Sequence, residues 1–555
     1  MPMLTINFMN FIDTKYYFLL TYFLTFVLLY FALFSRKPVN SGIFLILLVV
    51  LFFLCRVFVI LFNRQLNPDE SQMITQALTL REYPIVWKSV DPTTGGPLLS
   101  YMLILPTFFG FGFDYINAHF LAAVYLAGAM VFTFLAAKNW YGQRVAQISI
   151  LPVLVILSFT INAEFLHYSS ELLSILLISI ALYFYSAITL QAKQTKLLCF
   201  LTGLFLGCVP FAKLQAAPIG FVVGLFVLIE VIRFQHSYSK ALFLVIGSLS
   251  FPLLFCIFLG LNGALENMIT FYIKGNLSYD HSYMSNTGRL IKFLYVSFNL
   301  EKSISLYLLL LLPALSILTQ FIPKKYPILK NRHLIFLTLY LFSCIYSIAK
   351  SGAFFPHYYQ FLFFTGTIVY AYFIHIILKN STRSFAVLQA GLIIVVIVII
   401  KQGSGFNYEM RINNSMTSTD YGLGNSELKN SEIAQVIKKY SSPKDFIVIW
   451  GWGSDYYVEA QRMQGTMLNH RDFSTDLNLP HARAQYVSDI TRTRPKVFID
   501  INHREDEQEY IYEKFPALKQ YVDAHYNFYG KVEKARIFIR KDVPFVKKPE
   551  PVSGS

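Results

Sequence analysis

Charged residues are scarce in this chain. Only 14% of its 555 residues are Asp, Glu, Lys or Arg, against roughly 25% in soluble globular proteins. Together with a hydrophobic fraction of 55% and a mean hydropathy of +0.49, this scarcity excludes a soluble or a disordered protein. The composition therefore predicts a membrane protein.

Acidic residues are especially scarce in the first 401 residues. That part holds 26 basic and 12 acidic side chains, whereas the chain from Gln402 to its end holds 21 and 20. The formal net charge of +15 therefore lies almost wholly in the apolar part. This distribution indicates basic loops between membrane spans and argues against a nucleic-acid partner.

Cysteine is scarce as well. The five cysteines all fall in apolar segments, so the polar tail has no disulfide framework. No Cys/His spacing indicates a zinc site. The cysteines are Cys55, Cys199, Cys208, Cys256 and Cys344.

Long apolar runs are abundant. A span needs about 20 mostly apolar residues to cross the hydrocarbon core. Twelve segments qualify, some of them short: 16–34, 41–62, 114–137, 145–161, 172–190, 197–212, 215–233, 240–262, 303–322, 334–350, 358–378 and 385–401. The stretch 97–113 is also apolar, but Pro97, Pro106 and two glycines interrupt it, which predicts a helix at the membrane surface.

Lysine and arginine predict the orientation of these spans. One alternate set of loops holds 14 basic residues: Arg36, Lys37, Lys138, Arg144, Lys193, Lys196, Arg233, Lys240, Lys324, Lys325, Lys330, Arg332, Lys379 and Arg383. By the positive-inside rule these loops are cytoplasmic. The other loops, 63–113, 162–171, 263–302 and 351–357, then face outward. We expect a multi-pass protein of the inner (plasma) membrane, with its tail on the periplasmic or extracellular side.

The tail has the pattern of a small folded domain. After the membrane part (1–401) and a polar linker (402–430), strands and helices alternate between 431 and 545, which predicts an α/β domain. Expected helices cover 431–440, 480–494 and 507–525, and expected strands cover 446–450, 496–500 and 535–539. Residues 546–555 are expected to be disordered. The predicted fold class is mainly α, with about 12 transmembrane helices and this exterior domain.

The first outward loop carries two adjacent acids, Asp69 and Glu70, after Asn67 and Pro68. One interpretation is a helix start, because Asn is a good N-cap, Pro suits the first position and acids favour the first turn. The other is catalytic, since neighbouring carboxylates at a membrane surface suit one of them to general-base work. Lys88, in the same loop, is a candidate donor-binding residue.

Other candidates lie at the outward ends of later spans. Glu171 begins one span, Lys213 occupies the turn between two, and Lys350 and His357 flank another turn. Each has a structural alternative: Glu171 a solvated interface residue, Lys213 a snorkelling anchor. Tyr358 and Tyr359 are typical of an aromatic belt, although Tyr358 is also a donor-binding candidate. Glu164 and His167 are weaker candidates.

These motifs share an order along the chain. Asp69-Glu70 precedes Gly96-Pro97-Leu98-Leu99-Ser100-Tyr101, then Glu171, then Gly207 to Lys213, and then Pro356-His357-Tyr358-Tyr359. The order resembles the GT-C superfamily of integral-membrane glycosyltransferases, in the branch of the protein O-mannosyltransferases and the lipid A aminoarabinose transferase. The tail segment from Ile449 to Tyr457 is similar to bacterial members of that branch.

The resemblance implies a glycosyltransferase that uses a polyprenyl-phosphate-linked sugar on the outer face of the membrane. The first-loop acid of the family corresponds to Asp69, with Glu70 beside it. The family often has a Lys before its Pro-Leu segment, where this chain has Gly95 and Gly96, so Lys88, Lys213 and Lys350 are the alternative phosphate ligands. Some members bind a divalent ion with the same acids, which leaves Mg²⁺ or Mn²⁺ at Asp69 and Glu70 open.

The resemblance also implies partners, namely the lipid-linked donor, membrane lipids and a hydroxyl of a lipid, glycan or protein acceptor. Two other functions fit a polytopic chain. A transporter or flippase predicts internal repeats and polar groups at mid-span, of which Arg56 is the one clear example. A non-catalytic scaffold predicts that Asp69 is replaceable.

Overall fold

The structure, a computed structural model, describes residues 15–160, 162–191, 194–278, 284–299, 304–309, 311, 332–380, 382–412, 426–469, 480–501, 512–533, 535–544 and 546. The chain divides into two compact units. We call Met1–Phe62, His119–Cys256 and Leu277–Gly424 the membrane unit. We call Asn63–Ala118, Ile257–Asn276 and Asn425–Ser555 the loop–tail unit.

Within the described residues, eight helices are long and apolar enough to cross a membrane. They are Ser41–Leu61, Tyr115–Tyr141, Glu171–Thr189, Thr195–Ala212, Leu214–Phe234, Tyr238–Leu261, Arg332–Ala349 and Pro356–Lys379. They coincide with eight of the twelve predicted spans. Three more predictions correspond to the shorter apolar helices Leu19–Leu33, Gln143–Phe159 and Phe385–Lys401. The twelfth, 303–322, lies mostly outside the described residues. The chain is a multi-pass membrane protein.

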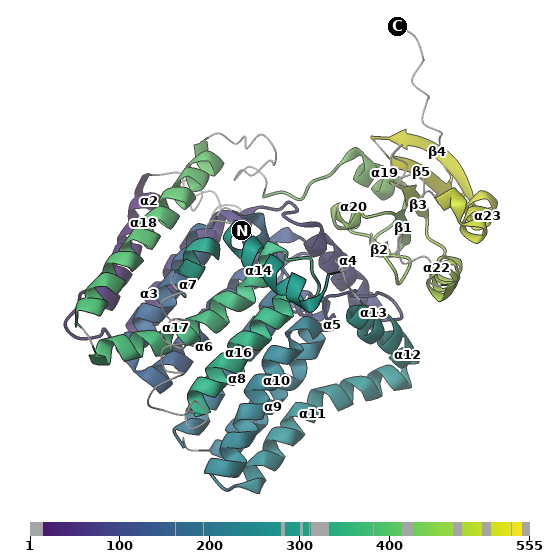
Figure 1. The fold of residues 1–555 in the computed structure, drawn as a ribbon. Helices are drawn as coiled ribbons and strands as arrows, with labels where there is room; N and C mark the ends of the chain where they lie inside the picture. Colours follow the sequence, from purple (N-terminus) through teal and green to yellow (C-terminus); the bar gives the residue numbers. More distant parts are fainter. Residues whose placement is uncertain are drawn as a thin grey trace. The chain divides into compact units, whose positions relative to one another are not determined.

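The membrane unit is built of long helices (Figure 1). In chain order they are α2 (Lys15–Leu33), α3 (Ser41–Leu61), α6 (Tyr115–Tyr141), α7 (Gln143–Phe159), α8 (Glu171–Thr189), α9 (Thr195–Ala212), α10 (Ala217–Ile229), α11 (Tyr238–Leu261), α16 (Arg332–Ala349), α17 (Gln360–Asn380) and α18 (Thr382–Ile412). The start of α6 and the end of α11 belong to the loop–tail unit. Helix α7 packs against α2, α3, α17 and α18, and its residues from Val145 to Phe159 are all buried. A helix that is apolar on all sides belongs in the middle of a bundle.

Glycines bring α9 and α11 into close contact. A Cβ atom added at Gly203 would lie 2.2 Å from the carbonyl oxygen of Leu244, and one at Gly207 would lie 2.4 Å from that of Ser248. Small residues spaced four apart allow backbones to approach in a membrane, where lipid offers no hydrophobic drive for helix association. The positions of Gly203 and Gly207 therefore fix how this helix pair packs.

Two predicted loop segments contain helix. The predicted outward loop 263–302 includes α12 (Leu265–Asn267), a π-helical turn (Met268–Lys274), α13 (Gly275–Ser278) and α14 (Asn286–Asn299). The predicted linker 402–430 begins inside α18, which continues to Ile412. The polar composition there suggested a linker, but no proline interrupts the helix, and Gly and Ser only weaken it.

The tail contains a five-stranded sheet of order β2-β1-β3-β5-β4 within the described residues. The strands are β1 (Phe446–Trp450), β2 (Met463–Gln464), β3 (Val497–Asp500), β4 (Tyr526–Val532) and β5 (Ala535–Arg540). Strand β1 pairs in parallel with β2 and β3, whereas β5 pairs antiparallel with β3 and β4. The predicted strands at 446–450, 496–500 and 535–539 are confirmed, and β2 and β4 were not predicted. The predicted disordered end, 546–555, lies outside the described residues apart from its first residue.

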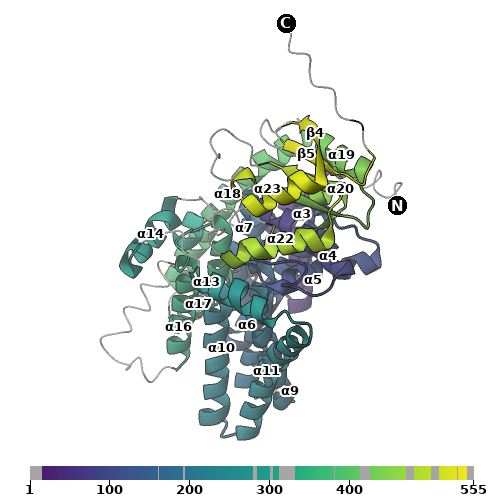
Figure 2. The ribbon, with the colours of Figure 1, turned by 90° about the vertical axis from the view of Figure 1, so that its right-hand side faces the viewer.

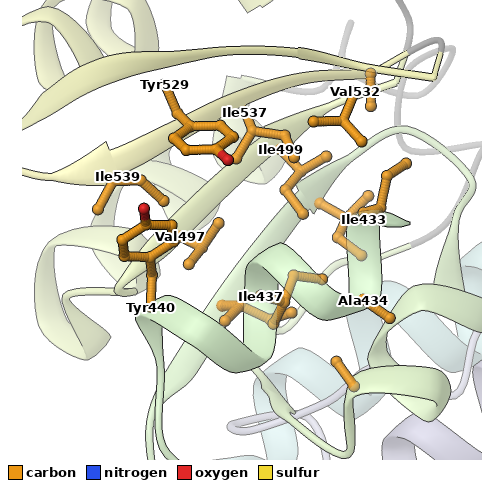
Figure 3. Close-up of a cluster of buried hydrophobic side chains, with 14 of the residues drawn as sticks. Ile433, Ala434, Ile437, Tyr440, Val497, Ile499, Tyr529, Val532, Ile537 and Ile539 are labelled. Atoms are coloured by element: carbon orange, nitrogen blue, oxygen red, sulfur yellow. The ribbon is translucent and has the colours of Figure 1, made fainter. Parts of the chain in front are cut away.

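Helices cover both faces of this sheet (Figure 2). Helices α19 (Glu432–Tyr440) and α20 (Ser454–Ala460) cover one face, and α22 (Pro480–Thr493) and α23 (Pro516–His525) the other. On the first face a cluster of buried side chains from α19 and α20 meets alternate residues of β1, β3 and β5 (Figure 3). Trp450 faces the opposite way and packs on Tyr486 and Phe515. This alternation is the period of two that a sheet covered on both faces requires.

The first loop folds together with the tail. It forms α4 (Pro68–Glu82), α5 (Pro97–Ile104) and a 3-10 helix (Leu105–Phe109). The last two match the helix predicted at 97–113. Helix α4 packs against α20 and β2. Thr75 Oγ1 donates to the carbonyl oxygen of Ser454 at 3.1 Å, and the backbone N–H of Gln464 donates to Thr79 Oγ1 at 3.1 Å. The tail thus supports the helix whose first turn carries Asp69.

Candidate active site

The start of α4 is fixed by a capping box. The side-chain oxygen of Asn67 accepts the N–H of Asp69 at 2.9 Å. Glu70 Oε1 accepts the N–H groups of Leu66 at 2.5 Å and of Asn67 at 3.4 Å. Pro68 occupies the first helical position, where its missing N–H is not needed. The helix-start interpretation of this motif is confirmed, and it holds the backbone of Asp69 in place.

Asp69 and Glu70 differ in what their carboxylates do. Asp69 is partly exposed, and its carboxylate has no hydrogen bond or ion pair among the described residues. Glu70 is 0% exposed and bonds backbone N–H groups of its own cap. An accessible acceptor is what a general base needs. Asp69 keeps its candidate catalytic role, whereas the structure gives Glu70 a structural one.

The same difference bears on a divalent ion. Glu70 Oε1 already accepts two N–H groups of the cap, so metal binding by both acids would have to use the other oxygen of Glu70. Among the described residues, no group of three or more His, Cys, Asp or Glu side chains could hold a metal ion. A divalent ion, Mg²⁺ or Mn²⁺, at Asp69 and Glu70 stays a prediction.

Buried polar side chains tie α4 to its surroundings in the loop–tail unit. Gln76 donates to the carbonyl oxygen of Asp91 at 2.9 Å and accepts the Ser100 hydroxyl at 2.7 Å. Ser71 donates to Gln65 Oε1 at 2.9 Å and also pairs with the Tyr115 hydroxyl at 2.8 Å. These bonds join α4 to the segment that precedes α5, to α5 itself and to the start of α6, so the first turn of α4 stands on a rigid base.

Lys88 lies elsewhere in the loop–tail unit. Its exposed ammonium donates to the carbonyl oxygen of Asn262 at 3.1 Å, near the end of α11. Asn267 bonds the carbonyl oxygen of the neighbouring Trp87 at 2.8 Å. The donor-binding role expected for Lys88 stays a prediction.

In the membrane unit, Lys213 and Glu171 form a buried ion pair. Lys213 Nζ lies 3.0 Å from Glu171 Oε1, and the two side chains are 4% and 0% exposed. Lys213 also donates to Ser170 Oγ at 2.6 Å, and that hydroxyl donates to the same carboxylate oxygen at 3.1 Å. The chain is extended at Lys213, between α9 and the next helical turn. The two candidates, far apart in sequence, are brought together as an ion pair.

A second acid–base pair lies beside the first. His357 Nδ1 is 2.5 Å from Glu164 Oε2, and the rings of His357 and His167 meet edge to face at 5.5 Å. Tyr358 lies under the Lys213 ammonium, which is 5.5 Å from its ring centroid. We call Glu164, His167, Ser170, Glu171, Lys213, His357 and Tyr358 the ion-pair cluster. Glu164 and His167, which were weaker candidates from the sequence, are thus members of it.

The aromatic-belt interpretation of Tyr358 and Tyr359 is wrong. Their exposed fractions are 3% and 0%, and Tyr359 stacks on Phe293 at 5.8 Å. Belt residues face lipid headgroups, whereas these rings are packed inside the unit. The sequence showed only that they follow a turn, and it could not show which way the rings point.

Polar capacity is left unused within the ion-pair cluster. Glu171 Oε2 and His167 Nε2 are buried and have no hydrogen-bond partner in the described residues. His167 Nδ1 pairs with the carbonyl oxygen of Ala163 at 3.0 Å, which assigns the proton to Nδ1 in neutral histidine. Buried polar atoms without a partner are unfavourable by about 1–3 kcal/mol each. They are therefore the atoms that a polar ligand would engage.

Arg56 belongs to the same region. It is 3% exposed in α3, and its guanidinium donates to the carbonyl oxygen of Phe165 at 2.8 Å. Phe165 is adjacent in sequence to Glu164, so this mid-span cation fixes the backbone that carries the second acid. The sequence signal was present, since ionisable groups inside spans are rare and are retained for a purpose.

Lys350 bonds residues that do not belong to the ion-pair cluster. Its ammonium donates to the carbonyl oxygen of Leu277 at 3.0 Å, and its own carbonyl oxygen accepts from Arg289 at 2.5 Å. Arg289, on α14, was not singled out by the sequence. The donor-binding role expected for Lys350 stays a prediction.

Comparison with known proteins adds the fold relationship. No protein-family model and no curated protein matches the sequence. The structure is similar to ArnT from Cupriavidus metallidurans bound to undecaprenyl phosphate, with a TM-score of 0.54 at 12% identity, over 90% of this chain and 98% of that one. The apo form of the same ArnT gives the same values. The chain has the GT-C fold.

The GT-C fold covers nearly all of both chains, so the resemblance found in short, ordered motifs is confirmed at the level of the fold. An oligosaccharyltransferase from Archaeoglobus fulgidus matches with a TM-score of 0.47 at 12% identity, over 89% of this chain and 73% of that one. In this GT-C fold Asp69 and the ion-pair cluster occupy different compact units.

Proposed function

We propose that the chain is a membrane glycosyltransferase that moves a sugar from a polyprenyl-phosphate donor to an acceptor hydroxyl. The acceptor is a hydroxyl of a lipid, a polysaccharide or a protein, on the outer face of the membrane. The fold supports this class of donor, because the ArnT structure of the same fold holds undecaprenyl phosphate. Fold alone does not carry function, so the roles below are argued from the residues.

The single observation that carries the proposal is the state of Asp69. Its carboxylate is accessible, makes no hydrogen bond or ion pair among the described residues, and stands on a backbone locked by the capping box. A base in this state can accept the proton of an acceptor hydroxyl as that oxygen attacks the sugar's anomeric carbon. We assign Asp69 that role.

The polyprenyl phosphate that departs needs a positive group. We assign this role to Lys213, because its ammonium is buried and is oriented by Ser170 and Glu171. Buried polar atoms without a hydrogen-bond partner in the described residues lie next to it. A compact ammonium in a water-poor site stabilises a developing phosphate charge far more than it would in water. Glu171 is then a positioning residue that holds Lys213.

The test begins with mass spectrometry of the lipids and glycans that disappear when the gene is deleted, which identifies the acceptor. Asp69→Asn is then compared with Glu82→Gln, which removes an exposed charge from the other end of α4. We expect transfer by Asp69→Asn to fall about 100-fold or more, the contribution of a general base. Glu82→Gln is expected to keep wild-type turnover.

Both variants must keep the unfolding temperature of the wild-type protein, because an amide has nearly the same size as the carboxylate that it replaces. Near-normal transfer by Asp69→Asn would refute the catalytic assignment. Equal losses in both variants would point to a general charge effect and would count against it as well.

A further inference from the structure

The tail domain contains a cavity that the proposed transfer does not use. It has a volume of about 270 Å³, at the small end of ligand sites. Its lining is apolar apart from one cation, and all of it belongs to the loop–tail unit. The lining residues are Trp450, Arg483, Ala484, Tyr486, Val487, Phe515, Pro516, Ala517 and Leu518.

The cavity lies where the sheet topology favours a ligand. Strand β1 has parallel neighbours on both sides, and the chain moves to one side for β2 and then to the other for β3. Such a reversal opens a crevice at the carboxyl ends of the strands, the usual ligand position in α/β sheets. Trp450, the last residue of β1, lines the cavity.

Aromatic rings give the cavity flat apolar walls. Trp450 meets Tyr486 edge to face at 5.3 Å and Phe515 at 5.2 Å. The Arg483 guanidinium stands over the Phe515 ring, 5.2 Å from its centroid. These walls suit a ring or a short alkyl group, because apolar surface gains most from being covered by apolar surface.

The electrostatics at the cavity favour an anion. Arg483 is the fourth residue of α22, and Pro516 to Leu518 form the first turn of α23. Neither helix has an acid in its first turn, so no carboxylate of that turn offsets the positive end of the helix dipole. Arg483 adds a full charge with a planar fork of donors.

We propose that this cavity binds a small organic anion, in which a ring or short alkyl body carries one phosphate or carboxylate. The body occupies the aromatic walls, and the anionic group meets Arg483 and the N-terminal turn of α23. The site depends neither on Asp69 nor on Lys213. It therefore adds a second ligand to the protein whatever the transferred sugar is.

The test uses the full-length protein in nanodiscs, with ligand-detected NMR and three probes. Phenyl phosphate has both parts of the proposed ligand, phenol has only the ring, and inorganic phosphate has only the charge. We expect phenyl phosphate to bind saturably and about tenfold or more tightly than either fragment, the ratio expected for one charge-assisted hydrogen bond. Equal binding of phenol and phenyl phosphate, or no saturable binding, would overturn the proposal.

Variants locate the binding. Arg483→Gln should weaken phenyl phosphate about tenfold and leave phenol unchanged, the loss of one charge-assisted hydrogen bond, whereas Ala484→Trp should fill the cavity and abolish both. Arg492→Gln is the matched control, since Arg492 is an exposed arginine of the same helix that does not line the cavity. If Ala484→Trp does not fold, the two arginine variants decide. Equal effects of Arg483→Gln and Arg492→Gln would overturn the site.

A comparison of neutral with anionic nanodiscs distinguishes a soluble ligand from a lipid headgroup. Phenyl phosphate binding that is unchanged between neutral and anionic nanodiscs identifies a soluble organic anion. Competition by the anionic phospholipid identifies a lipid headgroup with the same chemistry, and both results support the site.

Discussion

The two units satisfy their buried polar groups in different ways. In the membrane unit many hydroxyls bond the carbonyl oxygen one turn earlier on their own helix, as Thr25 does to Thr21 at 2.7 Å. Others reach a neighbouring helix, as Thr133 does to Ser179 at 3.2 Å. In the loop–tail unit, comparable groups bond across hundreds of residues, as Thr75 does to Ser454. Lipid offers no water, so a buried polar group in the membrane unit needs a partner in its own helix or in a neighbouring one.

This difference shows which polar groups need a functional explanation. In the membrane unit the ion-pair cluster stands out because two acid–base pairs, Lys213 with Glu171 and His357 with Glu164, lie side by side. In the loop–tail unit long-range polar bonds are ordinary, and the half-buried carboxylate of Asp69 has no bond among the described residues.

The largest expected effect comes from breaking the ion-pair cluster. Lys213→Met leaves Glu171 as an uncompensated buried charge, which lowers the free energy of unfolding by about 3–5 kcal/mol. The double variant Lys213→Met with Glu171→Leu should recover most of that stability but no sugar transfer. Unfolding in detergent and the transfer assay measure the two effects.

The control for this pair is Arg332→Met, which breaks an ion pair with Glu230 in which the arginine is 49% exposed. Its loss of stability should be smaller, because solvent already screens the half-exposed arginine and Gln235 still donates to the remaining Glu230 carboxylate. Recovery of transfer in the double variant would contradict the phosphate-binding role of Lys213.

The next effect is on the packing of α9 against α11. Gly207→Leu places side-chain atoms where a Cβ alone would already approach the carbonyl oxygen of Ser248 to 2.4 Å. We expect a loss of about 1–3 kcal/mol, typical of overpacking. Gly260→Leu is the matched control, since nothing lies within 4 Å of a Cβ there. Similar unfolding of the two variants would show that the close contact is not required.

A comparable or smaller loss is expected from removing a long-range polar link in the loop–tail unit. Gln76→Leu removes the acceptor of the buried Ser100 hydroxyl and one donor to the carbonyl oxygen of Asp91, at about 1–3 kcal/mol for the unpaired hydroxyl. Gln72→Leu on the same helix is the control, because its side chain makes no hydrogen bond in the described part. Hydrogen exchange of α4 amides reports the change. Equal protection in both variants would argue that Gln76 does not brace the helix.

The smallest effect is a pH dependence of the loop–tail unit. Burial and the neighbouring Glu459 carboxylate raise the pKa of Asp455 from 3.8 to about 6. The folded state then holds this proton more tightly than the unfolded state. The stabilisation that protonated Asp455 adds to the free energy of unfolding is therefore fully present below about pH 4 and is lost as pH rises through about 6. The unfolding temperature should fall less between about pH 5 and 7 in Asp455→Asn than in the wild type.

The exposed Glu432→Gln on α19 is the control for Asp455. It should follow the wild-type curve over the same pH range. If the unfolding temperature of Asp455→Asn also followed the wild-type curve, the pH dependence would belong to another group.

Local features of the fold were predictable from the sequence. The capping box needs only four consecutive residues, from Asn67 to Glu70, whose preferences all agree. The eight spans follow from length and hydropathy alone. Glu171 and Lys213 could be expected near each other, because both stand at the same end of successive spans. Such inferences use distances along the chain of at most one helical hairpin.

Features set by distant packing were not predictable. The pairing of His357 with Glu164 joins residues 193 apart, and no local pattern encodes it. Strand β4 was missed because its register shifts between Phe528 and Gly530, which breaks the alternation that marks a strand. The carboxylate of Glu70 looked equivalent to that of Asp69 until the direction of each side chain was known.

The bonds between α4 and the tail also set an order of events during synthesis. Thr75 and Thr79 meet partners that are 379 and 385 residues further along the chain. At about 5–20 residues per second, those partners emerge from the ribosome only tens of seconds after α4 does. The helix that carries Asp69 is therefore synthesised, just after the span Ser41–Leu61, well before the tail residues that it bonds. A chain that ends early can insert most of its membrane helices and still lack the tail contacts that support α4. Completion of synthesis is therefore itself a condition for activity.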